Sequence, residues 1–304
     1  MKRSATILAA ILSAMTLFAQ GKTVNEPLKI RNLTSVDLSS VWNVDIEYGS
    51  KQSVVLTYSE ELEPYIIAEV NGGELELSLN MDRMSRGLRN DINRKGYNNG
   101  KGSYILEAVI VSPSLESIDA SGAVNVHCSG RFKSDEFSVD LSGAANLTDL
   151  EVEAGGLNLD VSGAGRLAIP YVEAGECDMD FSGAASVSID GNIGDVNTDF
   201  SGASNVTMSG EYGNICVDAS GACDIRISGK ARKLKVDAFG ACNIKARELS
   251  VPEVFAGGSG ASNITVNPTE KITIDISGAT TLRYPKGVDA RIISVSRGCN
   301  IDTF

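Results

Sequence analysis

The chain of 304 residues has few of the side chains on which most enzymes rely. It holds one histidine and one tryptophan, and its aromatic residues make up 6% of the sequence. No Cys-x-x-Cys pair occurs among its six cysteines. These shortages argue against a thiolate metal or redox site and leave a single imidazole for general acid–base catalysis. The only histidine, His127, lies between Val126 and Cys128, which we expect to face inward, so its ring should be an isolated surface group.

Basic charge and long apolar runs are also scarce. The chain has 27 Lys and Arg against 39 Asp and Glu, a formal net charge of −12, which argues against nucleic acid as a partner. One continuous apolar run, residues 5–19, follows Lys2 and Arg3. It has the pattern of a signal peptide and is too short to span a membrane. We therefore expect residues 1–20 to be removed on export and residues 21–304 to form a single domain in the periplasm, at the cell surface or outside the cell, with no transmembrane segment.

Glycine, in contrast, is abundant, and ten glycines mark a repeat. Between residues 119 and 304 the phrase Asp-x-Ser-Gly-Ala-x-Asn, followed by an aliphatic residue, returns ten times with variations. The marker glycines are Gly122, Gly143, Gly163, Gly183, Gly202, Gly221, Gly240, Gly260, Gly278 and Gly298. A period of about 20 residues predicts coils that cannot bury their own apolar face and must stack on their neighbours.

The residues between the glycines predict strands. Leu157, Leu159 and Val161 alternate with Asn158 and Asp160, and this period of two with β-branched residues recurs in the other repeats. Short strands joined by a Ser-Gly-Ala corner predict an all-β parallel β-helix of about ten coils, stacked ~4.8 Å apart. The aliphatic residue after each asparagine should form an inward column: Val126, Leu147, Leu167, Val187, Val206, Ile225, Ile244, Ile264, Leu282 and Ile301.

Eight aspartates stand two residues before the serine of the repeat: Asp119, Asp140, Asp160, Asp180, Asp199, Asp218, Asp237 and Asp275. Stacked carboxylates about 5 Å apart repel one another. Either each accepts hydrogen bonds from backbone N–H groups at the turn, or cations share the ladder. The glycine-rich nonapeptide of calcium-binding β-rolls is absent, which favours a structural turn ladder without metal.

Two further columns carry polar or sulfur groups. Asn125, Asn146, Asn205, Asn243 and Asn263 occupy one position of the repeat. They are expected to hydrogen-bond along the solenoid, although they also offer a binding surface. Cys223 and Cys242 occupy equivalent positions in successive coils, so a disulfide between them is geometrically open.

The N-terminal third is less regular. We interpret residues 26–113 as a β cap and residues 114–304 as the regular coils, because a solenoid needs its terminal apolar face covered. Asn71-Gly72-Gly73 predicts a hairpin turn. The polar segment 81–103 is expected to be a loop. Its basic residues are the candidate binding residues: Arg83, Arg86, Arg89, Arg94, Lys95 and Lys101. One interpretation is a patch that binds an anionic glycan or a phosphate-rich component of the envelope. The other is a solvated insertion without a ligand.

At this point the sequence resembles a known family. The residues that match the family pattern are Pro113, Leu115, Ile118, Ser121, Gly122 and Ala123, together with the tandem Ser-Gly-Ala-x-Asn coils. They are similar to the auto-transporter adhesin head GIN domain family (DUF2807) of Bacteroidetes. The resemblance covers about residues 28–301. It implies a right-handed parallel β-helix, export, and a role as an adhesin.

The sequence therefore predicts a non-catalytic binding protein of the cell envelope or surface that needs no cofactor. The alternatives are a polysaccharide-active enzyme of the β-helix type, since many β-helices are lyases or hydrolases, and a purely structural periplasmic scaffold. Catalysis would require acids and bases that converge on one face. Such a group would appear as a local departure from the repeat, and the columns of the repeat show none. The sequence leaves the oligomeric state open.

Overall fold

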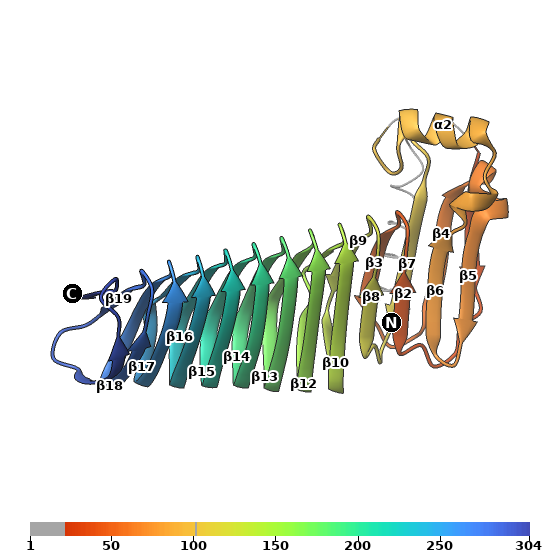
Figure 1. Cartoon of the computed structure of the whole chain (residues 1–304). Helices are drawn as coiled ribbons and strands as arrows, with labels where there is room; N and C mark the ends of the chain where they lie inside the picture. Colours follow the sequence, from red (N-terminus) through yellow and green to blue (C-terminus); the bar gives the residue numbers. More distant parts are fainter. Residues whose placement is uncertain (1–21, 101) are drawn as a thin grey trace.

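The computed structural model describes residues 22–100 and 102–304. The signal peptide expected over residues 1–20 and the candidate residue Lys101 therefore lie outside the described residues. The chain forms a parallel β-solenoid of about nine turns, with 70% of it in strands and 7% in helices. Figure 1 shows a rod with a broader N-terminal end. The parallel solenoid predicted from the ten corner motifs is confirmed, and its number of turns is close to the ten coils expected.

The N-terminal part contains short elements of both kinds. They are β1 (Thr23–Leu28), β2 (Ser35–Leu38), β3 (Asn43–Tyr48), β4 (Ser53–Ser59), the 3-10 helix η2 (Glu60–Tyr65), β5 (Ile66–Asn71), β6 (Glu74–Leu79), the 3-10 helix η3 (Met81–Arg83), α2 (Arg86–Lys95), β7 (Leu106–Ser112), β8 (Ser117–Ala120) and β9 (Asn125–Ser129).

The strands of the coils come next in the chain, and most of them are longer. They are β10 (Arg131–Gly143), β11 (Asn146–Thr148), β12 (Glu151–Gly163), β13 (Arg166–Gly183), β14 (Ser186–Gly202), β15 (Asn205–Gly221), β16 (Asp224–Gly240), β17 (Asn243–Gly260), β18 (Asn263–Ile276), β19 (Thr281–Tyr284), β20 (Asp289–Val295) and β21 (Asn300–Thr303).

Strand pairing continues two faces of the rod into the cap. The first face runs β5–β6–β2–β8–β10 and then through successive coils to β18 and β20. The second face runs β1–β4–β7–β3–β9–β11 and on to β19 and β21. The named strands pair in parallel except β1 with β4, β4 with β7, and β5 with β6, which are antiparallel. The cap therefore differs from the coils in strand direction, and the predicted hairpin at Gly72 is confirmed.

Nine of the ten corner glycines meet two requirements that Gly202 illustrates. Its φ of 97° is in the left-handed region, and a Cβ there would lie 2.4 Å from the carbonyl oxygen of Gly183 in the coil before. The next residue, Ala203, donates its N–H to that same oxygen at 2.7 Å. The close stacking of glycine on glycine thus satisfies the backbone at the corner and leaves no room for a side chain.

The core is a continuous apolar column along the axis of the rod. Nine of the ten residues predicted to face inward are buried: Val126, Leu147, Leu167, Val187, Val206, Ile225, Ile244, Ile264 and Leu282. Ile301 is only half-buried because it belongs to the last coil. Aromatic residues stack in the same manner, with Phe181 and Phe200 ring centroids 5.1 Å apart. Burial of these columns is the main source of stability, and each coil depends on its neighbours for it.

All six cysteines are free thiols in the structure. Cys223 and Cys242 are both buried at equivalent positions of neighbouring coils, as the repeat predicts, but they form no disulfide. The Sγ of Cys242 lies 3.4 Å from the carbonyl oxygen of Ala219. Both side chains therefore act as small apolar groups at the corner.

Candidate functional site

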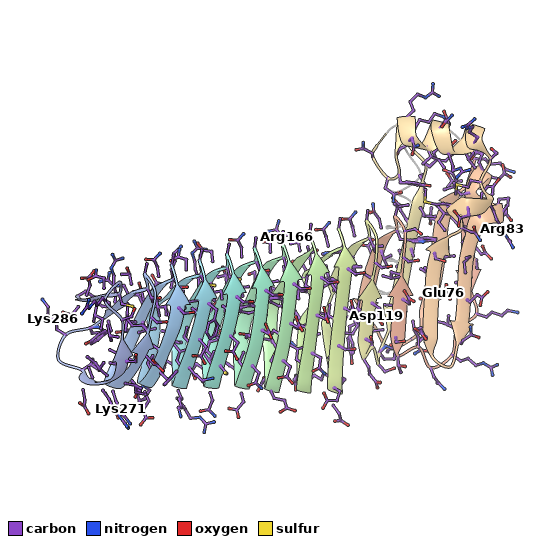
Figure 2. The ribbon with its side chains drawn as sticks, viewed as in Figure 1. Glu76, Arg83, Asp119, Arg166, Lys271 and Lys286 are labelled. Atoms are coloured by element: carbon purple, nitrogen blue, oxygen red, sulfur yellow. The ribbon has the colours of Figure 1, made fainter. Side chains whose placement is uncertain are left out.

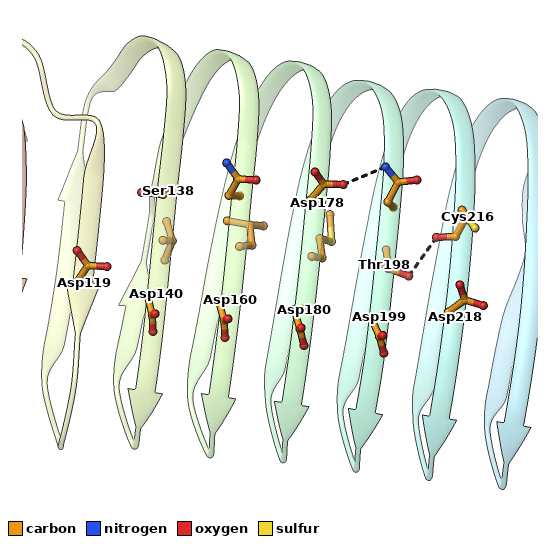
Figure 3. Close-up of a pocket in the computed structure, with 15 residues that line it drawn as sticks. Asp119, Ser138, Asp140, Asp160, Asp178, Asp180, Thr198, Asp199, Cys216 and Asp218 are labelled. Atoms are coloured by element: carbon orange, nitrogen blue, oxygen red, sulfur yellow. Dashed lines mark hydrogen bonds between the residues drawn. The ribbon is translucent and has the colours of Figure 1, made fainter.

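The first face of the rod carries a column of carboxylates. Strand pairing places Asp119, Asp140 and Asp160 in register, and Asp180, Asp199, Asp218 and Asp237 continue the column. Figure 3 shows the members from Asp119 to Asp218 side by side on successive strands. At the next coil Gly257 takes the position, and it separates Asp237 from Asp275. Seven of the eight predicted aspartates are therefore contiguous.

The column extends into the cap, which sequence reasoning missed. Asp37 pairs with Asp119 on one side and with Glu76 on the other, and Glu76 pairs with Glu69. The only sequence signal was that residues 36–46 echo the repeat, with Asp37 at the position of the repeated aspartate. Ten carboxylates in succession, from Glu69 to Asp237, thus lie on one line along the rod.

A shallow groove of about 620 Å³ lies along this face. Its floor contains the carboxylate column and a second polar column, in which Asn197 donates to Asp178 at 2.9 Å. Burial raises the pKa of Asp140, Asp160 and Asp180 above the ordinary aspartate value, and the neighbouring carboxylate of the column raises each further. The groove is therefore a surface on which negative charge is crowded and partly desolvated.

The role in the turns that the sequence predicts for these aspartates requires backbone N–H donors. The aspartates lie on strands before the corner, and within residues 22–100 and 102–304 none of these eight side chains accepts a backbone N–H. Asp119 accepts the hydroxyl of Ser117 at 3.1 Å, and Asp237 forms an ion pair with Lys235 at 2.7 Å. The corner is held by backbone hydrogen bonds instead, such as Ala203 to Gly183. No cluster of three metal-binding side chains occurs among the described residues.

The segment expected to be a loop, 81–103, contains a helix, which corrects the sequence prediction. Helix α2 begins after Ser85, whose Oγ accepts the N–H of Leu88 at 3.2 Å. It ends at Gly96, which has a φ of 75°. Leu88 and Ile92 are four residues apart and face the protein, and Ile92 is buried. The signals were present in the sequence but were outweighed by the surrounding polar residues.

The helix arranges the predicted basic residues unequally. Arg86, Arg89 and Asn93 are exposed and share one face at spacings of three and seven residues. Arg83, on η3, is also exposed, and Figure 2 shows it at the N-terminal end of the molecule. Arg83, Arg86 and Arg89 form no ion pair with the residues that the structure describes.

The other two described basic residues, Arg94 and Lys95, are partly neutralised. Both form ion pairs with Asp91, and the Lys95 Nζ lies 2.7 Å from its Oδ2. Tyr104 donates its hydroxyl to the same carboxylate at 2.8 Å. The bonds from Lys95 and Tyr104 are the main reason that the pKa of Asp91 falls to about 2. Free positive charge is therefore concentrated on Arg83, Arg86 and Arg89, which we call the arginine patch.

The second face carries the asparagine column near a pocket of about 430 Å³. Asn146 donates to Asn125 at 3.0 Å and Asn125 donates to Asn43 at 2.9 Å, so these members hydrogen-bond along the rod as predicted. The pocket also contains Glu107 and Asp45. Burial raises the pKa of Glu107, and the charge of Asp45 adds to the shift. His127 is exposed, as expected, with its Nδ1 3.1 Å from an Asp149 oxygen.

Comparison with known proteins identifies the family. The sequence profile described as "Putative auto-transporter adhesin, head GIN domain" matches residues 32–210 and 177–287. The chain belongs to this family, as its repeats predicted. No curated protein matches the chain.

Solved structures share the fold of this head GIN domain protein. A "putative lipid binding protein" from Parabacteroides distasonis ATCC 8503 has a TM-score of 0.55 at 17% identity, over 93% of this chain and 95% of that one. A "putative adhesin" from the same organism has a TM-score of 0.51 at 18% identity, over 94% of this chain and 99% of that one. At such low identity these matches show the fold and leave the ligand to be argued from the residues.

Proposed function

We propose that the protein is a non-catalytic, exported binding protein of the adhesin type, in which the arginine patch contacts an anionic glycan. The family is described as an adhesin. No helix among residues 22–100 and 102–304 is long and apolar enough to cross a membrane. The observation that carries the proposal is the exposure of Arg83, Arg86 and Arg89, without ion pairs within that range, in a chain with a net charge of −12.

The position of the patch supports a role in contact with a partner. Figure 1 shows α2 standing off the side of the rod at its N-terminal end. The helix is fixed there by the buried side chains of Ile92 and Met84 and by the bond from Tyr104 to Asp91. A rigid helix with arginines on one face presents planar donors to sulfate, phosphate or carboxylate groups. Residues 81–95 carry five basic and two acidic side chains, so this segment is opposite in sign to the carboxylate column.

Binding to sulfated and uronic-acid polysaccharides tests the proposal. The affinity should fall as salt rises, because exposed charges are screened. Replacing Arg83, Arg86 and Arg89 together by Ser should abolish binding and leave the thermal melt unchanged. The matched control replaces by Ser three exposed basic residues of the coils that form no ion pair with described residues, Arg166, Lys233 and Lys271. An equal loss of glycan binding in the control would show that binding depends only on net charge. Binding that survives in the arginine variant would overturn the proposal.

An enzyme remains the second candidate because of the pocket on the second face. Glu107 has a raised pKa, shares this pocket with Asp45 and His127, and has one carboxylate oxygen that is buried without a partner among the described residues. A pair of neighbouring carboxyl groups is the arrangement used for glycosidic hydrolysis. Turnover of a polysaccharide that is lost in Glu107→Gln would replace the binding proposal with a catalytic one.

The remaining alternatives are a periplasmic scaffold in place of a surface adhesin and a lipid ligand in place of a glycan. Proteolysis of intact cells should cleave a surface adhesin, whereas a periplasmic scaffold should be protected. For a lipid ligand, of the kind named for one structural neighbour, the described coil interior is filled by buried side chains. A lipid would therefore bind through its anionic headgroup. Vesicles of anionic lipid are the probe for it, and their binding in place of glycan would change the ligand class.

A further inference from the structure

The last coil leaves its inward side chains uncovered. In β20, Ile292 and Val295 pair with Ile274 and Ile276 of β18. The two β18 residues are 0% exposed, whereas Ile292 is 59% exposed and Val295 is 39% exposed. Among the described strands β20 pairs only with β18, so its outer backbone edge is open. The coil thus ends in an apolar edge strand, a surface that invites pairing with another strand.

The opposite end of the same face has a similar open edge. Strand β5 pairs only with β6 among the strands that the structure describes. Ile66, Ala68 and Val70 pair with the buried residues Leu79, Leu77 and Leu75, so they continue the inward columns. These three side chains are only half-buried because no further strand covers them.

One inward column links the two ends. It begins at Val70 and Leu75, passes through every coil of the first face, and ends at Ile274 and Ile292. An aliphatic column of this kind gains stability from each added neighbour, because every new strand removes apolar surface from water. A strand placed beside either edge would therefore extend the column by one member.

The segments that hold the two edge strands carry complementary charges. Residues 60–80, which include η2, β5 and β6, contain six Glu and no Lys or Arg. Residues 281–304, which include β19, β20 and β21, contain four Lys or Arg and two Asp. Figure 2 shows Glu76 at the N-terminal end and Lys271 and Lys286 at the other. Two like ends would repel each other, whereas unlike ends attract.

We propose that copies of this chain associate end to end, with β20 of one copy beside β5 of the next. Because β5 is antiparallel to β6 and so to the coils, a copy with the same orientation brings its β20 to β5 as an antiparallel neighbour. The register that places Arg291 opposite Glu69 also places Ile292 opposite Ala68 and Ala290 opposite Val70. Inward side chains then meet inward ones, and the exposed charges of Arg291 and Glu69 pair outside.

This contact is heterologous, since it joins two different surfaces. Such a contact closes into a ring only when each copy is rotated suitably, and otherwise it continues as an open filament. A nearly straight rod with its edges at opposite ends favours the filament. The first face would then be continuous from copy to copy (Figure 1).

Sedimentation velocity of the purified protein over a range of concentrations and salt tests the proposal. The average mass should rise steadily with concentration, and high salt should weaken the charged part of the contact. Ile292→Asp should leave a monomer, because it places a charge in the apolar part of the contact. Since Ile292 is 59% exposed, this variant should keep its fold, which circular dichroism would verify.

A charge exchange sharpens the test. Glu69→Arg and Arg291→Glu should each raise the concentration needed for association roughly tenfold, because an attraction becomes a repulsion. An equimolar mixture of the two variants should associate again, since each interface in an alternating chain then joins Arg to Glu. Exchange of two charges on a coil, Lys230→Glu and Glu211→Lys, is the matched control and should change nothing.

Three outcomes would overturn the proposal. A protein that stays monomeric at all concentrations would show that the edges have no partner of this kind. Association that depends on Arg291 but not on Glu69 would indicate pairing of two C-terminal ends. A mixture that behaves like the separate variants would exclude the Arg291–Glu69 register. Glycan binding by the arginine patch is measured separately and does not depend on any of these results.

Discussion

The coils and the N-terminal cap solve the problem of burying apolar strands in different ways. In the coils each position repeats one residue type, so Val206 and Ile225 stack on equivalents above and below, and so do Asp199 and Asp218. In the cap β6 and β7 cover the first coil, antiparallel strands lie beyond them, and few positions have an equivalent elsewhere. Stacking thus accounts for nearly every residue of a coil. It does not account for α2, and that is why the arginines on this helix point to a function.

The largest effect is expected from a charge in the core of the coils. Val206→Asp places a carboxylate where the side chain is fully buried, at a cost of several kcal/mol. Because each coil relies on its neighbours, thermal melting should show the loss of several coils together. Thr207→Asp, one residue on and exposed, is the matched control and should melt as the native protein does. A local effect only, with most strand signal retained, would show that the coils are less cooperative than their stacking implies.

A second comparison uses glycines with positive φ from both regions. Gly72 in the cap has a φ of 62° and open space around it, so Gly72→Ala should cost about 1 kcal/mol from backbone strain alone. At Gly202 the added Cβ also meets the Gly183 carbonyl, so Gly202→Ala should cost about 3 kcal/mol. Chemical denaturation of the two variants gives both values. Equal losses would mean that the corner can widen without penalty.

A smaller effect concerns the pH dependence of the carboxylate column. The raised pKa values of Asp140, Asp160 and Asp180 mean that the folded state binds protons more tightly than the unfolded state. Ionisation of these groups therefore lowers the free energy of unfolding at pH 7. This loss is relieved as the pH falls through the raised pKa values, and it returns as the pH rises. The melting temperature should therefore be higher near pH 5 than near pH 7. Replacing the three aspartates by Asn should raise stability at pH 7 and flatten the profile. An unchanged profile in that variant would assign the dependence to other groups.

The smallest change is expected at α2. Asp91→Asn removes the exposed ion pairs with Arg94 and Lys95, which should lower stability only slightly because solvent screens such pairs. It also leaves these two cations without their carboxylate, so salt-dependent binding of an anionic glycan should strengthen a few-fold. Titration of native and variant protein at equal salt measures this change. Weaker binding in the variant would indicate that Asp91 itself contacts the ligand.

The coils could be predicted from sequence because their information is local and repeated. The alternation around Leu157 and the glycine spacing fix strand, corner and inward column without knowledge of distant residues. The family and the solenoid could be inferred from the same pattern, and burial confirmed nine members of the aliphatic column. Ile301 is half-buried only because its coil is the last one, a property of its position along the rod and not of its motif.

The cap could be predicted less well because its contacts join distant segments. The register that places Glu69 and Glu76 in line with Asp37 depends on antiparallel pairing across a hairpin, which short-range patterns do not specify. For α2, Ser85, Ile92 and Gly96 gave usable signals, but they are separated by charged and polar residues of weak periodicity. Among the basic residues, the difference between Arg89 and Arg94 arises from the ion pair with Asp91, which only the folded helix reveals.

The carboxylate column gives this protein a property more familiar in nucleic acids. The interaction energy of two unit charges in water equals the thermal energy at a separation of about 7 Å, whereas stacked strands bring the carboxylates to about 4.8 Å. A line of charges that is denser than this limit gathers a layer of loosely held counterions along its length, as the phosphates of DNA do. Asp119 to Asp237 form such a line on consecutive coils. A polycation that settled on this face would displace the layer, and the entropy of the released ions would contribute to its binding.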